Sequence, residues 1–212
     1  MQKLAIIGTK EFAFQIRDFA LQLNQFEFVG YIDNVLPVGT EVEGKKVLGT
    51  VSEAISLYQQ HIFDCIFIAV GYTHFELREA YYNQLAGHIP FANIIMPNVK
   101  LGLNVRLGEG IFIGENTQIG NNTIINNNVF MHGDTHIAHD NVIGEHTYIS
   151  GRFNTAGFVT IGKRNFLGIG ILISDHISIC DDAWLGLGCI VAKDITIAGK
   201  YMSPSARLYR FE

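Results

Sequence analysis

An aliphatic residue returns at every sixth position over the second half of the chain, from Ile95 to Ile197, a span of 17 intervals of six. Thr155 is the only break in the series. An amphipathic helix cannot keep this register, because its apolar face recurs every 3.6 residues, whereas six is a multiple of the two-residue period of a strand. The repeat therefore predicts extended chain.

Each six-residue unit has two further regular positions. Two residues before the aliphatic one the chain prefers β-branched or small residues, such as Val129 and Thr135, so each unit is expected to be a short strand with two inward side chains. The residue after the aliphatic one is usually Gly, Ala or Ser, which we interpret as a corner. Short strands joined at tight corners predict a parallel β-helix whose coils satisfy one another's backbone hydrogen bonds.

The N-terminal part of the chain follows a different pattern. Strands are expected over residues 3–8, 27–33 and 63–71, and helices over 11–23, 51–60 and 74–85. This alternation predicts a small Rossmann-like parallel sheet, which binds ligands beyond the carboxyl ends of its strands. Helical spacing gives way to the six-residue period between Pro90 and Ile95. We therefore expect an α/β sugar-nucleotide-binding domain over residues 1–92 and an all-β acyltransferase domain over 93–212.

The six-residue pattern resembles the hexapeptide repeat of left-handed β-helix acyltransferases, in which three units close one triangular coil of 18 residues. On that geometry the repeat predicts between five and six coils. Together with the N-terminal sheet, it resembles bacterial N-acetyltransferases of nucleotide-linked amino sugars and the related sialic acid O-acetyltransferases. The segments that carry the resemblance are 5–8, 31–34, 47–49, 68–71, 138–140 and 142–145.

The resemblance implies substrates and site residues. The donor is acetyl-CoA, no metal takes part, and the acceptor is a nucleotide-linked deoxy-amino sugar for surface glycan synthesis. His139 is the implied general base for direct acyl transfer, with Asp140 as its acidic neighbour. The residues implied for acceptor binding are Gly8, Thr9, Asp33, Asn34 and Gly71. Those implied for coenzyme A binding are Tyr148, Gly157, Ile169 and Lys193.

The chain also departs from that family. Glu11 lies in the turn that is glycine-rich in relatives, where its charge opposes an anion. Asn34 replaces the second acid of a pair, and Tyr148 stands where some relatives have a second histidine. Asp33 fits acceptor recognition and a turn equally well, because an Asp that ends a strand often caps a turn.

The position of His139 supports a catalytic role independently. It follows the inward Ile137 by two places, so its ring is expected to project outward. Acyl transfer needs a base and an oxyanion donor. Gly157 follows His139 by 18 residues, so its amide is expected one coil away, about 4.8 Å along the axis. We therefore predict that His139, Asp140 and Gly157 form the catalytic group.

An alternative remains for this histidine. The segment also contains His132, His136 and His146, and such a group suits a solvated face or a metal site created by stacked coils. The metal interpretation is the weaker one, because no second cluster lies 18 residues away.

Composition limits the partners. A net charge of −5 and the lack of a basic cluster argue against nucleic acid and anionic membranes. No apolar run reaches transmembrane length, the start is too short for a signal peptide, and three cysteines lack metal-ligand spacing, so a cytoplasmic protein is expected.

Assembly and function follow from the same resemblance. Apolar residues expected on the outer faces need cover, and the family forms trimers with active sites between subunits, so a homotrimer is expected. These residues are Phe153, Phe158, Phe166 and Trp184. Basic side chains that suit the phosphates of coenzyme A, or only solvent, are Lys163, Arg164, Lys193 and Arg207. The predicted function is sugar N-acetylation; the alternatives are O-acetylation of a sugar such as sialic acid, and a catalytically silent scaffold or regulatory subunit.

Overall fold

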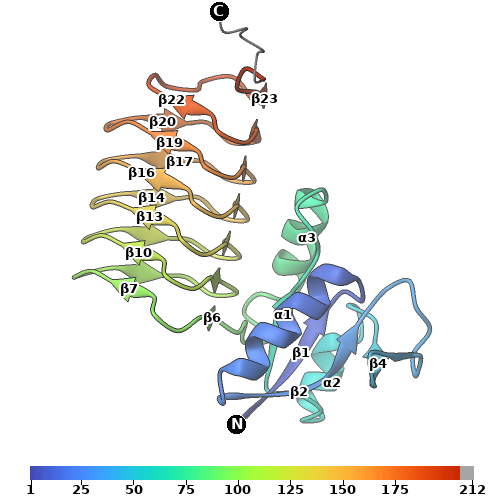
Figure 1. Ribbon diagram of the computed structural model, residues 1–212. Helices are drawn as coiled ribbons and strands as arrows, with labels where there is room; N and C mark the ends of the chain where they lie inside the picture. The colour runs from blue at the N-terminus through green and yellow to red at the C-terminus, as the bar shows by residue number, and fades with distance from the viewer. Residues whose placement is uncertain (206–212) are drawn as a thin grey trace, which may run out of the picture.

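The computed structural model describes residues 1–205 as a small sheet with three helices followed by a three-sided parallel β-helix (Figure 1). The N-terminal sheet has the strand order β3-β4-β2-β1-β5, and every pair is parallel except β3 with β4. Its strands are β1 (Gln2–Ile7), β2 (Phe26–Ile32), β3 (Glu41–Val42), β4 (Lys45–Gly49) and β5 (Cys65–Ile68). The helices are α1 (Glu11–Gln22), α2 (Ala54–Gln59) and α3 (Phe75–Leu85).

The expected strands and helices of this part are present, with ends that differ by a few residues. The β3–β4 hairpin was not predicted, because its sequence is mostly polar and exposed around a glycine turn at Gly44. Only Val47 and Gly49 of β4 are buried, and β4 is held by pairing with β2 rather than by a hydrophobic pattern of its own.

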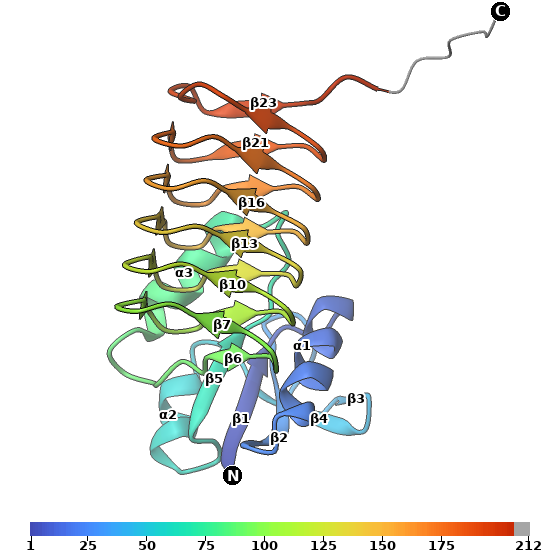
Figure 2. The same cartoon turned by 60° about the vertical axis from the view of Figure 1, so that its left-hand side comes forward.

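The six-residue period corresponds to the strands of the β-helix, which form three sheets of six, five and seven strands. Each strand pairs with the strand 18 residues later, as Ile119 does with Ile137, so three units close one coil as expected (Figure 2). The strands are β6 (Ile94–Ile95), β7 (Lys100–Leu101), β8 (Arg106–Leu107), β9 (Phe112–Ile113), β10 (Gln118–Ile119), β11 (Ile124–Ile125), β12 (Phe130–Met131), β13 (His136–Ile137), β14 (Val142–Ile143), β15 (Tyr148–Ile149), β16 (Asn154–Thr155), β17 (Thr160–Ile161), β18 (Phe166–Leu167), β19 (Leu172–Ile173), β20 (Ser178–Ile179), β21 (Ala183–Leu185), β22 (Ile190–Val191) and β23 (Gly199–Tyr201).

Close approach of neighbouring coils explains the small residue at each corner. A Cβ on Gly120 would lie 2.6 Å from the carbonyl carbon of Ala138 in the next coil, which leaves no room for a larger side chain. Each corner then turns through a residue with left-handed backbone, such as Asn122 (φ 59°) or Asp140 (φ 57°). Asn and Asp tolerate that conformation better than other side chains, so they suit these corners.

The break in the repeat is also explained. Thr155 remains inward and buried, and its hydroxyl accepts hydrogen bonds from the Ala138 amide (3.2 Å) and from Asn141 Nδ2 (3.1 Å). The expectation that Phe153 lies on an outer face is wrong. Phe153 occupies the inward position two residues before Thr155 and is completely buried in the β-helix core.

A hydrophobic cluster joins the two parts of the molecule. The outward aromatic side chains of β9, β12, β15, β18 and β21 form a column of stacked rings, with centroids 4.4 Å apart for Phe112 and Phe130 and 4.0 Å apart for Phe166 and Trp184. Phe12 and Tyr72 of the N-terminal part pack on this column, and most of it shares one core with β1 and β2. The N-terminal part therefore covers one face of the prism. No helix within residues 1–205 is long and apolar enough to span a membrane.

Candidate active site

His139 and Asp140 form a hydrogen-bonded pair on an edge of the prism, at the corner between β13 and β14. His139 Nδ1 lies 2.8 Å from Asp140 Oδ2, and the imidazole is half-exposed, as its outward position predicted. Hydrogen bonds from His139 and Asn122 lower the pKa of the Asp140 carboxyl group. An ionised carboxylate only accepts hydrogen bonds, so Nδ1 carries the proton and Nε2 presents its lone pair outward.

Gly157 lies directly against this ring, one coil away. A Cβ on Gly157 would lie 2.7 Å from His139 Cε1 and 2.9 Å from Nε2, so only glycine leaves the ring in place. At the equivalent point of the first coil, the Leu103 amide donates to Asn121 Oδ1. The residue 18 positions after Gly157 is Asp175, whose carboxylate instead binds Ser174 and His176. Within residues 1–205, no acceptor bonds to the Gly157 amide.

All five residues predicted to bind the acceptor line one cavity of about 400 Å³ in the N-terminal part. The cavity lies at the carboxyl ends of β1, β2 and β5, where a parallel sheet presents its ligand site. Lys10 and Glu11 at the start of α1 also line it, and α1 has no side-chain cap there.

The polar groups of this cavity bond largely to one another. Asp33 Oδ2 accepts from the Thr9 hydroxyl (2.6 Å), and its Oδ1 accepts from the amides of Val35 and Leu36. Asn34 accepts from the Val51 amide and donates to the hydroxyl of Tyr81. The turn that Asp33 was expected to cap is therefore present, and both side chains shape the cavity wall.

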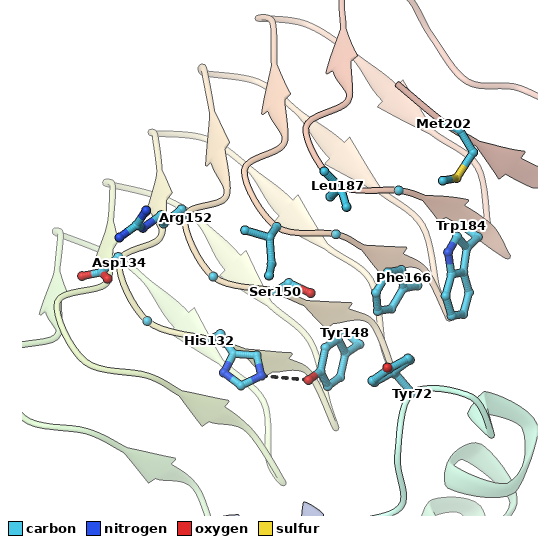
Figure 3. Close-up of a pocket in the computed structure, with 15 residues that line it drawn as sticks. Tyr72, His132, Asp134, Tyr148, Ser150, Arg152, Phe166, Trp184, Leu187 and Met202 are labelled. Atoms are coloured by element: carbon cyan, nitrogen blue, oxygen red, sulfur yellow. Dashed lines mark hydrogen bonds between the residues drawn. The ribbon is translucent and has the colours of Figure 1, made fainter. Parts of the chain in front are cut away.

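The largest cavity, about 860 Å³, lies between the β-helix and the loop at Tyr72 (Figure 3). Tyr148 and Ile169 line it, and the Tyr148 hydroxyl lies 2.8 Å from His132 Nε2. Burial raises the pKa of Tyr148 to about 12 and lowers that of His132, so both are neutral near pH 7. The sequence gave no role to Tyr72; its only signal was its place after a predicted strand end.

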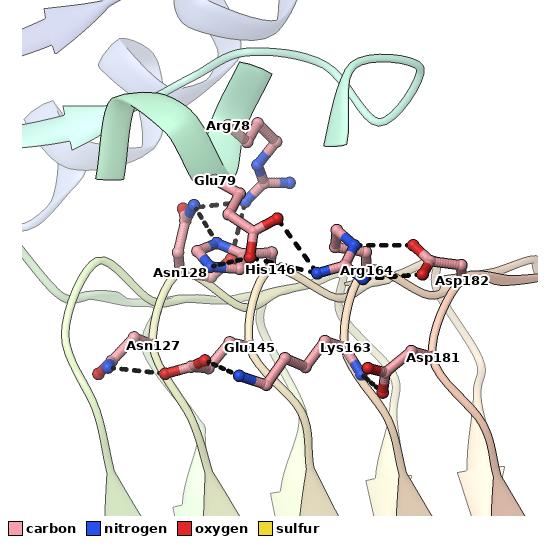
Figure 4. A network of polar contacts seen from close by, with 10 residues as sticks. All are labelled: Arg78, Glu79, Asn127, Asn128, Glu145, His146, Lys163, Arg164, Asp181 and Asp182. Carbon is pink, nitrogen blue, oxygen red and sulfur yellow. Dashed lines mark hydrogen bonds and ion pairs between the residues drawn. The ribbon is translucent and has the colours of Figure 1, made fainter. Parts of the chain in front are cut away.

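The residues predicted to bind coenzyme A do not share one cavity. Lys193 lines a separate cavity of about 540 Å³ at the C-terminal end of the β-helix, and Gly157 lies beside His139. Lys163 and Arg164 already form ion pairs, with Glu145 and with Asp182 and Glu79 respectively (Figure 4). Arg207 lies outside the described residues.

The four histidines expected to cluster have separate environments. His146 is 2% exposed, accepts or donates at Nδ1 with Asn128 Nδ2 (3.0 Å), and has its pKa lowered to about 4 by burial (Figure 4). Nearby, Arg78 of α3 is completely buried and donates to the Asn128 carbonyl group. No group of three or more His, Cys, Asp or Glu side chains within residues 1–205 is arranged to hold a metal ion.

The two candidate sites lie on different sides of the chain. The N-terminal part packs on the sheet that contains β12 and β15, and α3 reaches the edge at Asn128 and Arg164. His139 lies on the edge between the other two sheets, which points away from the N-terminal part (Figure 1). Within one chain, the His139 pair therefore does not face the cavity of about 400 Å³.

Comparison with known proteins bears on both parts. Residues 3–85 match the family model described as the PglD N-terminal domain. No curated protein sequence gives a significant match.

Solved structures match the whole chain. The acetyltransferase domain of PglB from Neisseria gonorrhoeae is 20% identical, with a TM-score of 0.83 over 96% of this chain and 97% of that one. PerB from Caulobacter crescentus, in complex with CoA and GDP-perosamine, is 21% identical, with a TM-score of 0.80 over 96% and 95%. WeeI from Acinetobacter baumannii is 20% identical, with a TM-score of 0.63 over 98% and 99%. The chain thus has the fold of the hexapeptide-repeat sugar acetyltransferases, an N-terminal domain of the PglD type followed by a left-handed parallel β-helix.

Proposed function

We propose that this protein transfers the acetyl group of acetyl-CoA to the amino group of a nucleotide-linked amino sugar. One observation carries the proposal: an oriented His–Asp pair lies against a glycine whose amide has no acceptor within residues 1–205. The titles of similar structures support the substrate class, since PerB was solved with CoA and GDP-perosamine and PglB with acetyl coenzyme A.

The chemistry follows from these groups. Nε2 of His139 removes a proton from the acceptor amine as its nitrogen forms a bond to the thioester carbon, and Asp140 stabilises the imidazolium that results. The Gly157 amide donates to the developing oxyanion. When the intermediate collapses, the carbon–sulfur bond breaks and His139 returns the proton to the CoA thiolate. No acyl-enzyme is required.

Assembly completes the site in this proposal. Because His139 points away from the acceptor cavity of its own chain, a second subunit must bring its cavity to that edge (Figure 1). Exposed apolar side chains on the outer surface would be covered by such an interface: Phe158, Ile169, Leu172, Leu187 and Ile190. We propose a homotrimer, in which cyclic symmetry creates three equal sites. Residues 1–92 would bind the nucleotide, Tyr148 and Ile169 would contact the donor near the sugar, and Lys193 would meet its phosphates.

The test of activity is a panel assay. Purified protein is mixed with acetyl-CoA and nucleotide-linked amino sugars, and thiol release is measured with and without His139→Ala. Release above background with one sugar, and loss of ~10²-fold or more in the variant, is expected. Equal rates in the two proteins would overturn the proposal. Acetylation of a hydroxyl sugar instead would favour the O-acetyltransferase alternative, and failure to bind acetyl-CoA would favour a silent scaffold.

The test of assembly uses two inactive variants. Light scattering is expected to give about three times the 23.6 kDa chain mass. Co-expressed His139→Ala and Asp33→Ala chains are expected to regain part of the activity, because a mixed trimer contains sites with one intact histidine and one intact cavity. A mass near that of one chain would exclude the shared site.

A further inference from the structure

A column of three polar side chains ends at the His139–Asp140 pair. Asn104, Asn122 and Asp140 follow one another at intervals of 18 residues on the same edge of the prism. Nδ2 of Asn104 donates to Oδ1 of Asn122 (3.1 Å), and Nδ2 of Asn122 donates to Oδ1 of Asp140 (3.1 Å). Their φ angles of 57°, 59° and 57° give the three side chains the same direction from the backbone.

The carboxylate sets the direction of this column. Ionised Asp140 only accepts hydrogen bonds, so Asn122 must turn its amide nitrogen toward Asp140 and its oxygen toward Asn104. One oxygen of Asp140 is then taken by Asn122 and the other by Nδ1 of His139 (2.8 Å). Two bonds at opposite oxygens fix the plane of the carboxylate, and that plane fixes the ring of His139.

We propose that Asn122 is a positioning residue for acyl transfer, which holds Asp140 in the orientation that keeps the Nε2 lone pair of His139 directed at the acceptor. This inference rests on the proposed role of His139 as base. Asn122 itself touches neither the ring nor the substrates; it acts through the carboxylate.

The chain contains a matched control. Asn116 donates to Asp134 Oδ1 across the same interval of 18 residues, at 3.2 Å, and its φ is also 59°. No histidine within residues 1–205 bonds to Asp134. Replacing either asparagine by glycine removes one amide–carboxylate hydrogen bond and keeps a residue that tolerates the left-handed backbone.

The kinetic experiment compares Asn122→Gly with Asn116→Gly. Asn122→Gly is expected to lower kcat by about tenfold with both KM values unchanged, because the substrates still bind but the base is misoriented. Asn116→Gly is expected to leave kcat within twofold and to lower the melting temperature by a similar amount. In an Asp140→Ala background, Asn122→Gly should have no further effect. Equal kcat for the two glycine variants would overturn the inference.

A second measurement does not depend on activity. Nitrogen-15 NMR of histidine-labelled protein distinguishes an imidazole protonated at Nδ1 from one protonated at Nε2. The wild-type and Asn116→Gly proteins are expected to show His139 as the Nδ1–H tautomer, and Asn122→Gly a mixture. An unchanged tautomer in Asn122→Gly would refute the positioning role. If His139→Ala retains full activity, the proposed function fails while this signal still tests the contact; if His139→Ala is inactive and Asn122→Gly is not impaired, only the present inference fails.

Discussion

The ring of His139 rests on the α-carbon of Gly157, so closely that a single methyl group there would lie 2.7 Å from Cε1. Gly157→Ala is therefore expected to push the imidazole aside and lower kcat by ~10- to 100-fold. Thiol release from acetyl-CoA measures the loss, and thermal melting checks the fold. In a His139→Ala background the added methyl group meets no ring, so a further loss there would contradict this explanation.

Removing the charge of Asp140 tests its contact with His139 directly. Asp140→Asn keeps the size of the side chain but permits it to donate to Nδ1, which would move the ring proton to Nε2 and block the base. We expect kcat to fall by ~10² or more and affinity for CoA to stay the same. Steady-state kinetics and calorimetry measure the two effects. A variant with normal kcat would show that the carboxylate neither orients nor stabilises the imidazole.

Glu11 tests how the N-terminal cavity receives an anion. Its carboxylate lies at the first turn of α1 and lines the cavity, where it opposes a phosphate group. Glu11→Gln should strengthen nucleotide-sugar binding or leave it unchanged, whereas Asp33→Ala should weaken it because the 33–36 turn loses its cap. Calorimetry decides, with Glu76→Gln in the first turn of α3 as the control. Loss of binding in folded Glu11→Gln would make Glu11 a recognition residue.

His146 makes stability depend on pH. Its pKa is lowered from 6.5 to about 4 because it is buried, so the unfolded chain takes up this proton before the folded one does. Its contribution is complete above about pH 6.5 and is lost as pH falls toward about 4, by up to ~3 kcal/mol. Urea unfolding of wild type and His146→Asn at pH 7.5 and 5 measures this difference, and His136→Asn is the control. A variant with the same pH dependence as wild type would exclude His146 as its source.

The β-helix was predictable because one short rule decides it. Each inward position is fixed by the six-residue period, and even Thr155 keeps its place by bonding within the core. The position of Gly157 beside His139 follows from the same arithmetic. The partners of Asp33 and Asn34 did not, because Tyr81 and Val51 reach them only through the packing of α3 and the β4–α2 connection. The same is true of His132 and Tyr148, whose contact depends on rotamers and not on register.

The column of aromatic rings has a consequence for how such chains diversify. Phe112, Phe130 and Tyr148 belong to the repeat, yet they share one core with Phe12 and Phe19 of the N-terminal part. A cut between the parts would leave this oily strip in water, so neither half is a free-standing cassette. Recombining this N-terminal half with a foreign prism would succeed only where the new prism offers a ring at every coil along that face.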